Sequence, residues 1–309
     1  MVHAGNFAGV IWQVIRMTNA KLLEGIVIKT VGGVFTVETD VAKFTCFAPK
    51  KLRYNDLDLL VGDKVRFSDL HRGKGSIVEI LPRKNRLTRP EVANVDACLF
   101  VLASVPQPDF YLADKVLINC FQQKIEPIIV VNKIDLGLQT AQQVQQNYAE
   151  ICDVVCVSAT DDSLSQKLRP YIENRVVCFA GQSAVGKTSI LNALLPNLGG
   201  KTGAVSQKSG RGTHTTRHTS LHKVMNGYVM DTCGFSLCTL ENVRSDELRL
   251  YCDDFVKLSV ACKFTSCTHT VEPDCAVKKA VEEGTLCRER YERYVEEHKE
   301  LVEMEKNKY

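Results

Sequence analysis

The sequence predicts a protein of three folded domains: an N-terminal β-barrel, a central α/β domain and a mostly helical C-terminal domain. Short β-patterned runs fill the first part, apolar runs alternate with helical stretches in the middle, and helical patterning surrounds a Cys/His cluster near the end. A chain of 309 residues can bury two or three separate cores. We place an N-terminal extension at residues 1–20, the barrel at 21–87, the α/β domain at 88–240 and the helical domain at 241–309.

Five short runs in the barrel region have the pattern of β-strands. They are "GIVIKT", "GVFTVET", "AKFTCFAP", "DKVRFSDL" and "GSIVEILP", with turns expected at Gly32-Gly33 and at residues 61–63. Such closely spaced strands suit a small barrel of the OB-fold type, whose open face commonly binds nucleic acid. Composition alone does not separate an OB-fold from an SH3-like barrel. The basic segment 81–90 that follows is expected to be a linker.

The middle of the chain contains five continuous apolar runs separated by helical stretches. The runs are "DACLFVLASV", "PIIVVNK", "DVVCVSA", "RVVCFAG" and "GYVMDTCG". Strands without polar alternation are buried on both faces, which is typical of a parallel sheet covered by helices. Each candidate motif lies where one of these strands ends, and open α/β sheets bind ligands there.

A glycine-rich loop, "GQSAVGKTS" at residues 181–189, lies between a strand and a helical run. It fits G-x-x-x-x-G-K-[ST], and residues 181–188 are called the phosphate loop below. The glycines let backbone N–H groups point at phosphates, Lys187 supplies a cation, and Thr188 offers a hydroxyl to Mg²⁺. The following helix adds the partial positive charge of its N-terminus. The expected nucleotide-contacting residues are Gly181, Gln182, Ser183, Ala184, Val185, Gly186, Lys187, Thr188 and Ser189.

The motif "NKID" at residues 132–135 predicts which base is bound. Asp135 would accept hydrogen bonds from N1–H and the 2-amino group of guanine, whereas adenine would leave the carboxylate unpaired. Asn132 would fix the loop, and the stem of Lys133 would cover a face of the ring. A companion loop is expected at "VSAT", residues 157–160, where a plain turn is the alternative. The expected base-contacting residues are Asn132, Lys133, Ile134, Asp135, Ser158 and Ala159.

Elements that would sense the γ-phosphate come later in the chain. "DTCGF" fits D-x-x-G, in which Asp231 would hold Mg²⁺ through water and Gly234 would contact the γ-phosphate. The stretch 199–220, rich in Gly, Ser, Thr and basic residues, is expected to be a mobile switch loop. Either Thr215 or Thr216 would close on Mg²⁺, and the sequence does not choose between them.

Phe235 occupies the position at which many GTPases place the glutamine that orients the attacking water. Its side chain cannot hydrogen-bond to water, so unassisted hydrolysis is expected to be slow. His214, in the switch loop, is the candidate for the orienting group, and a surface histidine without a catalytic role is the alternative.

The order of the motifs predicts a circularly permuted P-loop GTPase domain. The base-reading motif precedes the phosphate loop, whereas ordinary GTPases have the reverse order. Permutation is feasible when the original termini lie close together at the surface. The chain also runs directly from D-x-x-G into the Cys/His region, so a loop that rearranges on hydrolysis could transmit the nucleotide state to a separate domain.

The Cys/His region "CKFTSCTHTVEPDC" has the spacing C-x4-C-x-H-x5-C. Three thiolates and one imidazole suit tetrahedral Zn²⁺ without an open position, so the site is expected to be structural. Chance clustering among 13 cysteines is the alternative, and Cys252 and Cys287 are expected to be ordinary thiols. An amphipathic stripe in the last helix is expected to pack on the protein's own body. The expected metal ligands are Cys262, Cys267, His269 and Cys275.

Composition indicates a soluble cytoplasmic protein. Hydrophobic residues make up 45% and charged residues 24%, and no apolar run is long enough to span a membrane. We expect no signal peptide, because residues 1–20 lack a basic start and a small-residue cleavage site. The odd count of 13 cysteines, several of them alone in apolar runs, indicates reduced thiols.

The net charge of +3 is unevenly distributed. Residues 1–90 contain fifteen Lys/Arg and eight Asp/Glu, a net charge of +7, so the remainder carries −4. A basic N-terminal domain indicates a polyanionic partner, with a solvated basic surface as the alternative.

In these motifs and their order the chain resembles the RsgA (YjeQ) family of GTPases that depend on the small ribosomal subunit. The resemblance covers about residues 20–300 and includes "LPRKNRLTRP", "IEPIIVVNKIDL", "GQSAVGKTS", "GRGTHTT", "DTCGF" and "EPDCAV". It implies an OB-fold, a circularly permuted GTPase domain and a C-terminal zinc domain. It also implies GTP hydrolysis stimulated by the small subunit, a role in late 30S maturation, and rRNA contact by the barrel and the zinc domain. The family's catalytic histidine maps onto His214.

The sequence departs from the family pattern at three places. Cys233 stands where members commonly have Pro, and Ala184 stands where they have Gly. The companion base loop continues as "TDDSL" rather than a Gly-containing run, so its contacts are the least defined. Two alternative hypotheses about the function are a P-loop ATPase and a nucleotide-regulated RNA-binding protein with little catalytic turnover. We expect a monomer that binds GTP and GDP, with no membrane partner.

Overall fold

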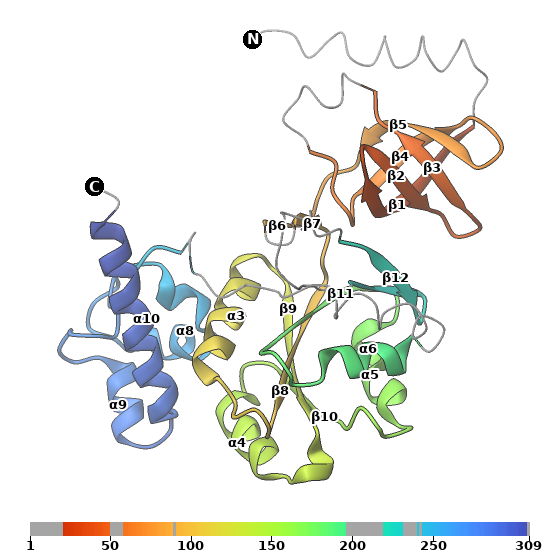
Figure 1. Ribbon diagram of the computed structural model, residues 1–309. Helices are drawn as coiled ribbons and strands as arrows, with labels where there is room; N and C mark the ends of the chain where they lie inside the picture. Colours follow the sequence, from red (N-terminus) through yellow and green to blue (C-terminus); the bar gives the residue numbers. More distant parts are fainter. Residues whose placement is uncertain are drawn as a thin grey trace, which may run out of the picture. The chain divides into compact units, whose positions relative to one another are not determined.

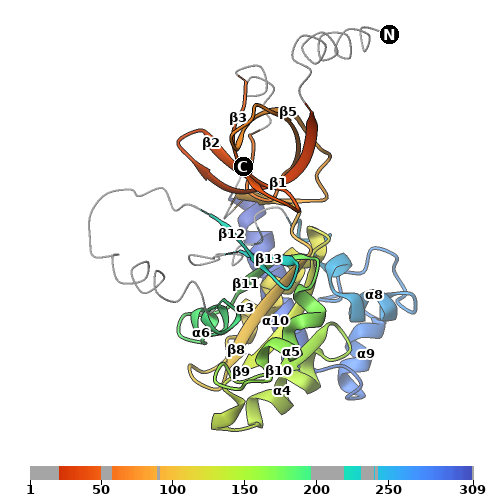
Figure 2. The same cartoon turned by 90° about the vertical axis from the view of Figure 1, so that its right-hand side faces the viewer.

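The computed structural model describes most of the chain, in two compact units (Figures 1 and 2). The described residues are 21–49, 58–88, 91–195, 219–230, 240 and 243–307. One unit comprises Met1–Val95 and His214–Lys223, and the other comprises Asp96–Thr213 and Val224–Tyr309.

Five strands close into a barrel in the first unit. They are β1 (Leu22–Val31), β2 (Val34–Glu38), β3 (Lys43–Phe47), β4 (Lys64–Asp69) and β5 (Lys74–Ile80). Around the barrel the order is β1-β2-β3-β5-β4, with β3 and β5 parallel and the other described pairs antiparallel (Figure 2). A five-stranded barrel of this kind has the architecture of an OB-fold, so the predicted barrel is confirmed.

Alternating side chains build the barrel core. In β4 the inward residues Val65 and Phe67 are fully buried, while the residue between them is exposed. Gly75 of β5 faces the same core, and a Cβ atom there would lie 2.7 Å from both the sulfur of Cys46 and the ring of Phe67. Glycine is therefore required at this position for the strands to approach so closely.

Residues 81–88 of the basic segment, which the sequence predicts to be a linker, are described by the structure. The segment leads into a two-stranded hairpin formed by β6 (Arg86–Thr88) and β7 (Glu91–Ala93). The buried carboxylate of Asp63 accepts hydrogen bonds from Nε and Nη2 of Arg83, at 2.7 and 2.8 Å. Because such a bidentate pair is strong and directional, it holds the start of this segment against the barrel.

The central sheet has six strands in the order β10-β9-β8-β11-β13-β12 (Figure 1), and the five strands from β10 to β13 in this order belong to the second unit. The strands are β8 (Ala97–Ala103), β9 (Glu126–Asn132), β10 (Asp153–Cys156), β11 (Val176–Ala180), β12 (Leu221–Val224) and β13 (Gly227–Met230). The five strands from β10 to β13 in this order are parallel to their neighbours. Every residue of β8 and β11 is buried, as the continuous apolar runs predict.

Helices cover both faces of the sheet (Figure 1). They are α3 (Phe110–Gln122), α4 (Gln139–Tyr148), α5 (Leu164–Ile172) and α6 (Lys187–Leu194), together with the 3₁₀ helix η1 (Ile134–Leu136). Leu99 and Val101 of β8 pack in one cluster with Leu168 of α5 and Ile190 of α6. Helix α3 lies on the opposite side of β8. The predicted central α/β domain is therefore confirmed.

The C-terminal region is helical. Its elements are η2 (Leu248–Tyr251), α8 (Asp253–Ser259), α9 (Ala276–Glu282) and α10 (Arg288–Lys306). Its core surrounds the fully buried Phe255, whose ring centroid lies 4.7 Å from that of Tyr294. Tyr294 and Leu301 are buried, so the predicted stripe does pack on the protein itself. Arg290 and Glu297 of α10 are buried as well, which the apolar pattern did not predict.

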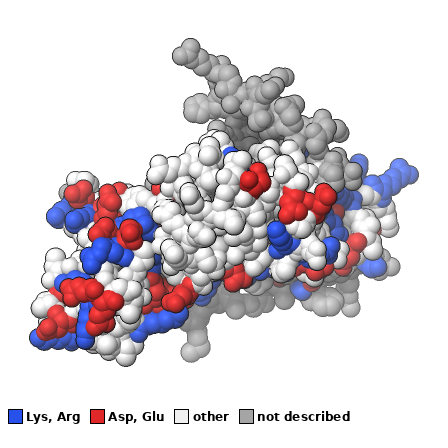
Figure 3. All heavy atoms as spheres, turned by 90° about the horizontal axis from the view of Figure 1, so that it is seen from below, with Lys and Arg blue, Asp and Glu red and all other residues white. Residues whose placement is uncertain are grey.

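Charged side chains of both signs cover the surface of these C-terminal helices. On the face drawn in Figure 3, Lys and Arg alternate closely with Asp and Glu over this region. None of the described helices has both the length and the apolar composition needed to cross a membrane.

Candidate functional site

Three predicted loops lie at one edge of the sheet. β9 ends at Asn132, the first residue of "NKID", and β10 ends at Cys156, directly before "VSAT". β11 ends at Ala180, and the phosphate loop begins at the next residue. These strands are parallel, so their carboxyl ends meet at the same edge and the three motifs converge there.

The predicted nucleotide-binding residues divide into two groups. Those of the three loops are described by the structure: Asn132, Lys133, Ile134, Asp135, Ser158, Ala159, Gly181, Gln182, Ser183, Ala184, Val185, Gly186, Lys187, Thr188 and Ser189. The remaining ones, His214, Thr215, Thr216, Asp231 and Gly234, lie outside the described residues. The roles of the second group stay predictions from the sequence.

The backbone of the phosphate loop requires glycine at two positions. At Gly181 φ is 129°, and a Cβ atom would lie 2.2 Å from the carbonyl oxygen of Val101. At Gly186 φ is 98°, and a Cβ atom would lie 2.3 Å from Nδ2 of Asn132. Ala184 also has a left-handed conformation, with φ at 64°. That conformation costs an L-residue about 1–2 kcal/mol, and alanine adopts it where the family resemblance expects glycine.

Lys187 begins helix α6 and reaches back across the phosphate loop. Its ammonium donates to the carbonyl oxygen of Gly181 at 2.7 Å and also to that of Gln182. The side chain is half-buried, and desolvation lowers the pKa of Lys187. An anion beside the ammonium would reverse this effect, because it favours the charged form. The position suits a lysine that neutralises phosphate charge.

Asn132 connects all three loops. Its Nδ2 donates to the carbonyl oxygen of Val185 in the phosphate loop at 2.9 Å. Its Oδ1 accepts from the backbone N–H of Ala159 in the companion loop at 3.1 Å. The side chain is only 1% exposed, so these bonds are shielded from water. The first residue of the base-reading motif therefore fixes the geometry of the whole edge.

Lys133 adds a second connection. Its backbone is left-handed, with φ at 61°, which turns the chain into η1. Its ammonium donates to the carbonyl oxygens of Val105 and Ala184, at 2.7 and 2.8 Å. The side chain is thus held along the phosphate loop, where its methylene stem can cover a ring face.

Asp135 and Ser158 lie beside each other, as expected of a base-reading pair. The hydroxyl of Ser158 donates to Oδ1 of Asp135 at 2.5 Å, and it lies 2.9 Å from the hydroxyl of Thr160. Asp135 is exposed, so its carboxylate can receive donors from a ligand. The "NKID" loop and the companion loop, which the sequence predicts separately, are therefore in direct contact through these two side chains.

Sequence reasoning missed the loop between β8 and α3. The backbone oxygen of Val105 binds Lys133, and backbone groups of Gln107 and Asp109 bind the side chain of Gln182. Backbone donors and acceptors exist at nearly every position, so no residue pattern marks them. A search of the sequence for motifs therefore cannot identify this loop.

The second candidate site is a Cys/His cluster. The ligand atoms of its four residues all lie within 4.8 Å of one another. Nδ1 of His269 lies 3.4 Å from the sulfur of Cys275 and 3.7 Å from that of Cys262, and these two sulfurs are 4.0 Å apart. Tetrahedral Zn–S bonds of about 2.3 Å place sulfurs about 3.8 Å apart, so the donor set fits zinc. The four residues are those predicted: Cys262, Cys267, His269 and Cys275.

The electrostatics of the cluster also favour a cation. Burial raises the pKa of the Cys267 thiol to about 12, and burial lowers the pKa of His269. A divalent ion would offset both effects, because it binds thiolate and neutral imidazole. Nε2 of His269 is buried and has no hydrogen-bond partner among the described residues, so Nδ1 is the nitrogen that faces the thiols.

Neighbouring residues fix the loop that carries His269. The hydroxyls of Tyr291 and Tyr294 in α10 donate to the carbonyl oxygens of His269 and Thr268, at 2.9 and 2.7 Å. Glu272 accepts from the backbone N–H and the hydroxyl of Thr268, both at 2.7 Å. Partial burial raises the pKa of Glu272, but these hydrogen bonds outweigh it and lower the pKa to about 2. Such support is typical of a metal site.

Comparison with known protein families identifies the barrel and the α/β domain. A family model described as the RsgA N-terminal domain matches residues 24–77, and one described as the RsgA GTPase matches residues 80–241. The small ribosomal subunit biogenesis GTPase RsgA of Geobacillus sp. (strain WCH70) is 40% identical over 289 residues, covering 91% of this chain and 98% of the relative. The protein of the same name from Caldanaerobacter subterraneus subsp. tengcongensis is 37% identical over 291 residues, covering 93% and 98%.

Solved structures give the same result. YjeQ from Thermotoga maritima matches with a TM-score of 0.79 and 32% identity, covering 91% of this chain and 99% of that one. YloQ, described as a circularly permuted GTPase, matches with a TM-score of 0.79 and 32% identity, covering 92% and 96%. The barrel and the permuted motif order thus agree with the matches in sequence and structure, and the chain belongs to the RsgA family of circularly permuted, GTP-hydrolysing enzymes.

Proposed function

We propose that this protein hydrolyses GTP to GDP and phosphate, that the small ribosomal subunit stimulates the reaction, and that it acts in late maturation of the 30S subunit. The names of the relatives support the ribosomal role. The observation that carries the nucleotide site is Asn132, whose amide joins the phosphate loop to the companion base loop.

Each loop has a proposed role. The phosphate loop binds the phosphates through its backbone N–H groups and Lys187. Asp135 accepts from the guanine edge, and the stem of Lys133 covers the ring. Supporting this assignment, Asp135 is exposed while Lys133 is already held along the phosphate loop. The other predicted residues of the three loops are proposed to make the remaining contacts to the nucleotide.

Hydrolysis requires a water oxygen to attack the γ-phosphorus. The new O–P bond forms as the bond to the β–γ bridging oxygen breaks, and GDP leaves with the electron pair. The proton lost by the attacking water passes to an oxygen of the transferred phosphoryl group and on to solvent, and phosphate is released. We assign the orienting contact to His214, because Phe235 offers no polar side-chain atom. Mg²⁺ would be held by Thr188, by one of Thr215 and Thr216, and through water by Asp231, and it would neutralise phosphate charge.

The Cys/His cluster is proposed to hold one structural Zn²⁺. Its four ligands leave no open position for a substrate. The barrel and this C-terminal region are proposed to contact rRNA, which would use the +7 charge of residues 1–90. We further propose that the protein acts in the cytoplasm as a monomer, since its partner is the ribosomal subunit.

Replacing Asp135 tests the guanine assignment. Asp135→Asn exchanges an acceptor for a donor, so GTP affinity should fall about 100-fold while xanthosine triphosphate, which has an acceptor at C2, should bind better. Titration with fluorescent derivatives of GTP and xanthosine triphosphate measures both affinities. Titration of the unmodified protein with ATP tests the alternative hypothesis that it is an ATPase. Asp161→Asn is the matched control, because among the described residues that exposed carboxylate bonds to Ser163 and to Lys167 of α5, away from the other two loops. Unchanged GTP affinity in Asp135→Asn would refute the guanine assignment.

A further inference from the structure

Helix α3 is attached to the phosphate loop at its N-terminal end. Asp109 caps the helix by accepting from the backbone N–H of Leu112 at 2.9 Å. The backbone N–H of Asp109 in turn donates to Oε1 of Gln182 at 3.1 Å, and Nε2 of Gln182 donates to the carbonyl oxygen of Gln107 at 3.2 Å. Gln182 is the second residue of the phosphate loop. Its side chain therefore joins that loop to the start of α3.

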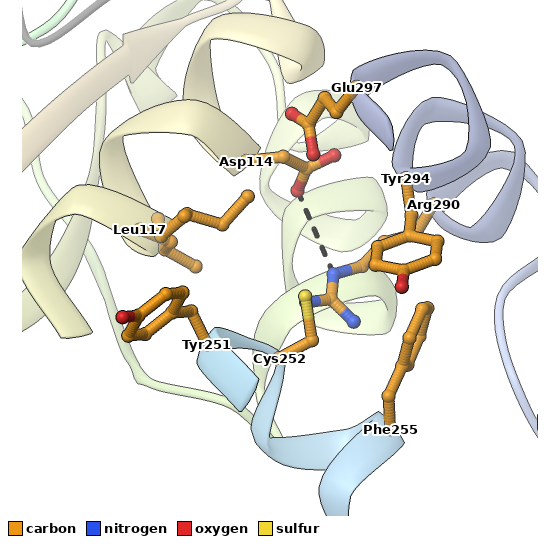
Figure 4. Close-up of a pocket in the computed structure, with 9 residues that line it drawn as sticks. Asp114, Leu117, Tyr251, Cys252, Phe255, Arg290, Tyr294 and Glu297 are labelled. Atoms are coloured by element: carbon orange, nitrogen blue, oxygen red, sulfur yellow. Dashed lines mark ion pairs between the residues drawn. The ribbon is translucent and has the colours of Figure 1, made fainter. Parts of the chain in front are cut away.

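A little further along, α3 is attached to the C-terminal region through Asp114. This carboxylate is 5% exposed and accepts from the hydroxyl of Tyr148 at 2.9 Å and from Nε of Arg293. Nε of Arg290 lies 3.7 Å from it, and Arg290 also pairs with Asp254 of α8. Figure 4 shows Asp114 pointing from α3 toward the guanidinium of Arg290 in α10. Buried charges thus tie one helix of the sheet domain to two helices of the C-terminal region.

These contacts make α10 sensitive to the position of α3. Guanidinium–carboxylate bonds are directional, and in a buried site water cannot replace a lost partner. Burial raises the pKa of Asp114, while Arg293 and Arg290 lower it, so its charge depends on their positions. A shift of α3 would therefore have to be accompanied by a movement of α10 or by a new pairing.

A new pairing is available inside the cluster. Oε1 of Glu297, Oδ1 of Asp254 and Nε of Arg290 are buried without hydrogen-bond partners among the described residues. A cavity of about 10 Å³ lies against Arg290 and Glu297, and Asp114 forms part of its wall (Figure 4). Buried polar groups normally have partners. These atoms would be able to take new hydrogen-bond partners if α3 shifted, so a displaced α3 would not leave the cluster without pairings.

We propose that Gln182 and Asp114 are positioning residues on one connector, and that α3 couples nucleotide binding in the phosphate loop to the C-terminal metal-binding region. The inference rests on the proposed function, because it assumes that the phosphate loop binds a nucleotide. Nucleotide would set the position of the loop, Gln182 would pass the change to the N-terminus of α3, and Asp114 would pass it to Arg290 and Arg293. This route runs through residues that the structure describes, whereas the predicted switch loops lie outside the described residues.

The first test needs no substitution. Amide hydrogen exchange of the full-length protein is followed by mass spectrometry with and without GDP, and the readout is the peptide that covers α10. We expect GDP to change the exchange of this peptide as well as that of the phosphate loop. Absence of GDP binding would refute the proposed function, whereas GDP binding with unchanged exchange in α10 would refute the coupling alone.

The second test is a double-mutant cycle on GDP affinity. Linkage is reciprocal, so Arg293→Met in α10 should change the Kd for fluorescent GDP about five-fold. In the background of Gln182→Met, which keeps the length but loses both hydrogen bonds, the same change should be less than about two-fold. If Arg293→Met does not fold, Asp114→Asn replaces it in the cycle.

Two controls separate coupling from general loss of stability. Glu300→Gln removes the more exposed Lys115–Glu300 pair, 2.8 Å long, between the same two helices, and should leave GDP affinity within about two-fold. Gln182→Glu keeps an acceptor for Asp109 and should restore part of the coupling. Additive effects of the two substitutions, or an equal effect of Glu300→Gln, would overturn the proposal.

Discussion

Glu297 is a buried carboxyl group whose burial is not offset by the neighbouring positive charges. Its side chain is 1% exposed, and desolvation together with the nearby carboxylate of Asp114 raises its pKa to about 9. Lys115, Arg290 and Arg293 face it and lower the pKa only in part. The carboxyl group is therefore neutral in the folded protein at pH 7.

The raised pKa of Glu297 makes the folded state less stable as pH rises. In the unfolded chain the pKa of Glu is about 4.3, so Glu297 does not reduce the free energy of unfolding below that pH. Above it, the free energy of unfolding falls by about 1.4 kcal/mol per pH unit, until the pH reaches the folded-state pKa of about 9. Glu297→Gln removes this titration and should raise the free energy of unfolding by about 5 kcal/mol at pH 8, but by less than about 1 kcal/mol at pH 4.5. Urea unfolding at a series of pH values measures the difference.

The neighbouring glutamate supplies the control. Glu296 is exposed on the same helix, so Glu296→Gln should change the free energy of unfolding by less than about 0.5 kcal/mol at any pH. If the difference between Glu297→Gln and the unmodified protein did not grow with pH, Glu297 would be ionised in the folded state and our assignment would be wrong.

At the scale of elements, α10 links the buried charge cluster to the Cys/His cluster. Arg290 and Glu297 belong to the cluster, while Tyr291 and Tyr294 hold the backbone around His269. Helix α10 thus packs against both the charge cluster and the Cys/His cluster. Loss of a bound metal ion should therefore destabilise the whole helix, and not only the loop that carries the ligands.

Removal of zinc tests this link. We expect one zinc ion per chain by atomic absorption, and a strong chelator should lower the melting temperature by at least about 5 °C, because metal binding contributes to folding. Cys262→Ser should bind no zinc and melt at the lower temperature, whereas Cys287→Ser, outside the ligand set, should keep the ion. A metal content near zero in freshly purified protein, or full zinc in Cys262→Ser, would exclude the site.

At the scale of the whole molecule, the sequence predicts the fold and the positions of the motifs. Apolar runs mark the buried parallel strands, and motifs that follow such strands must meet at one edge, where Asn132 indeed joins them. The four clustered Cys and His residues were found because a ligand set leaves a distinctive spacing.

The connections between these parts could not be predicted. Asp114 and Arg293 are separated by 179 positions, and charged residues on an amphipathic helix ordinarily face solvent. The bonds of Gln182 end on backbone groups, which carry no residue signature. Nor does the pattern of segment 81–90 show that Arg83 would be held by Asp63. Long-range pairings of single residues depend on the folded geometry.

The rate of phosphate release from GTP by the full-length protein, with and without purified small ribosomal subunits, tests the central claim most directly. We expect the subunits to raise the rate at least about tenfold, because an orienting group that Phe235 cannot supply becomes effective only in the complex. His214→Ala should bind GTP normally and lose most of this increase. An equal rate with and without subunits, from protein that binds GTP, would contradict the account.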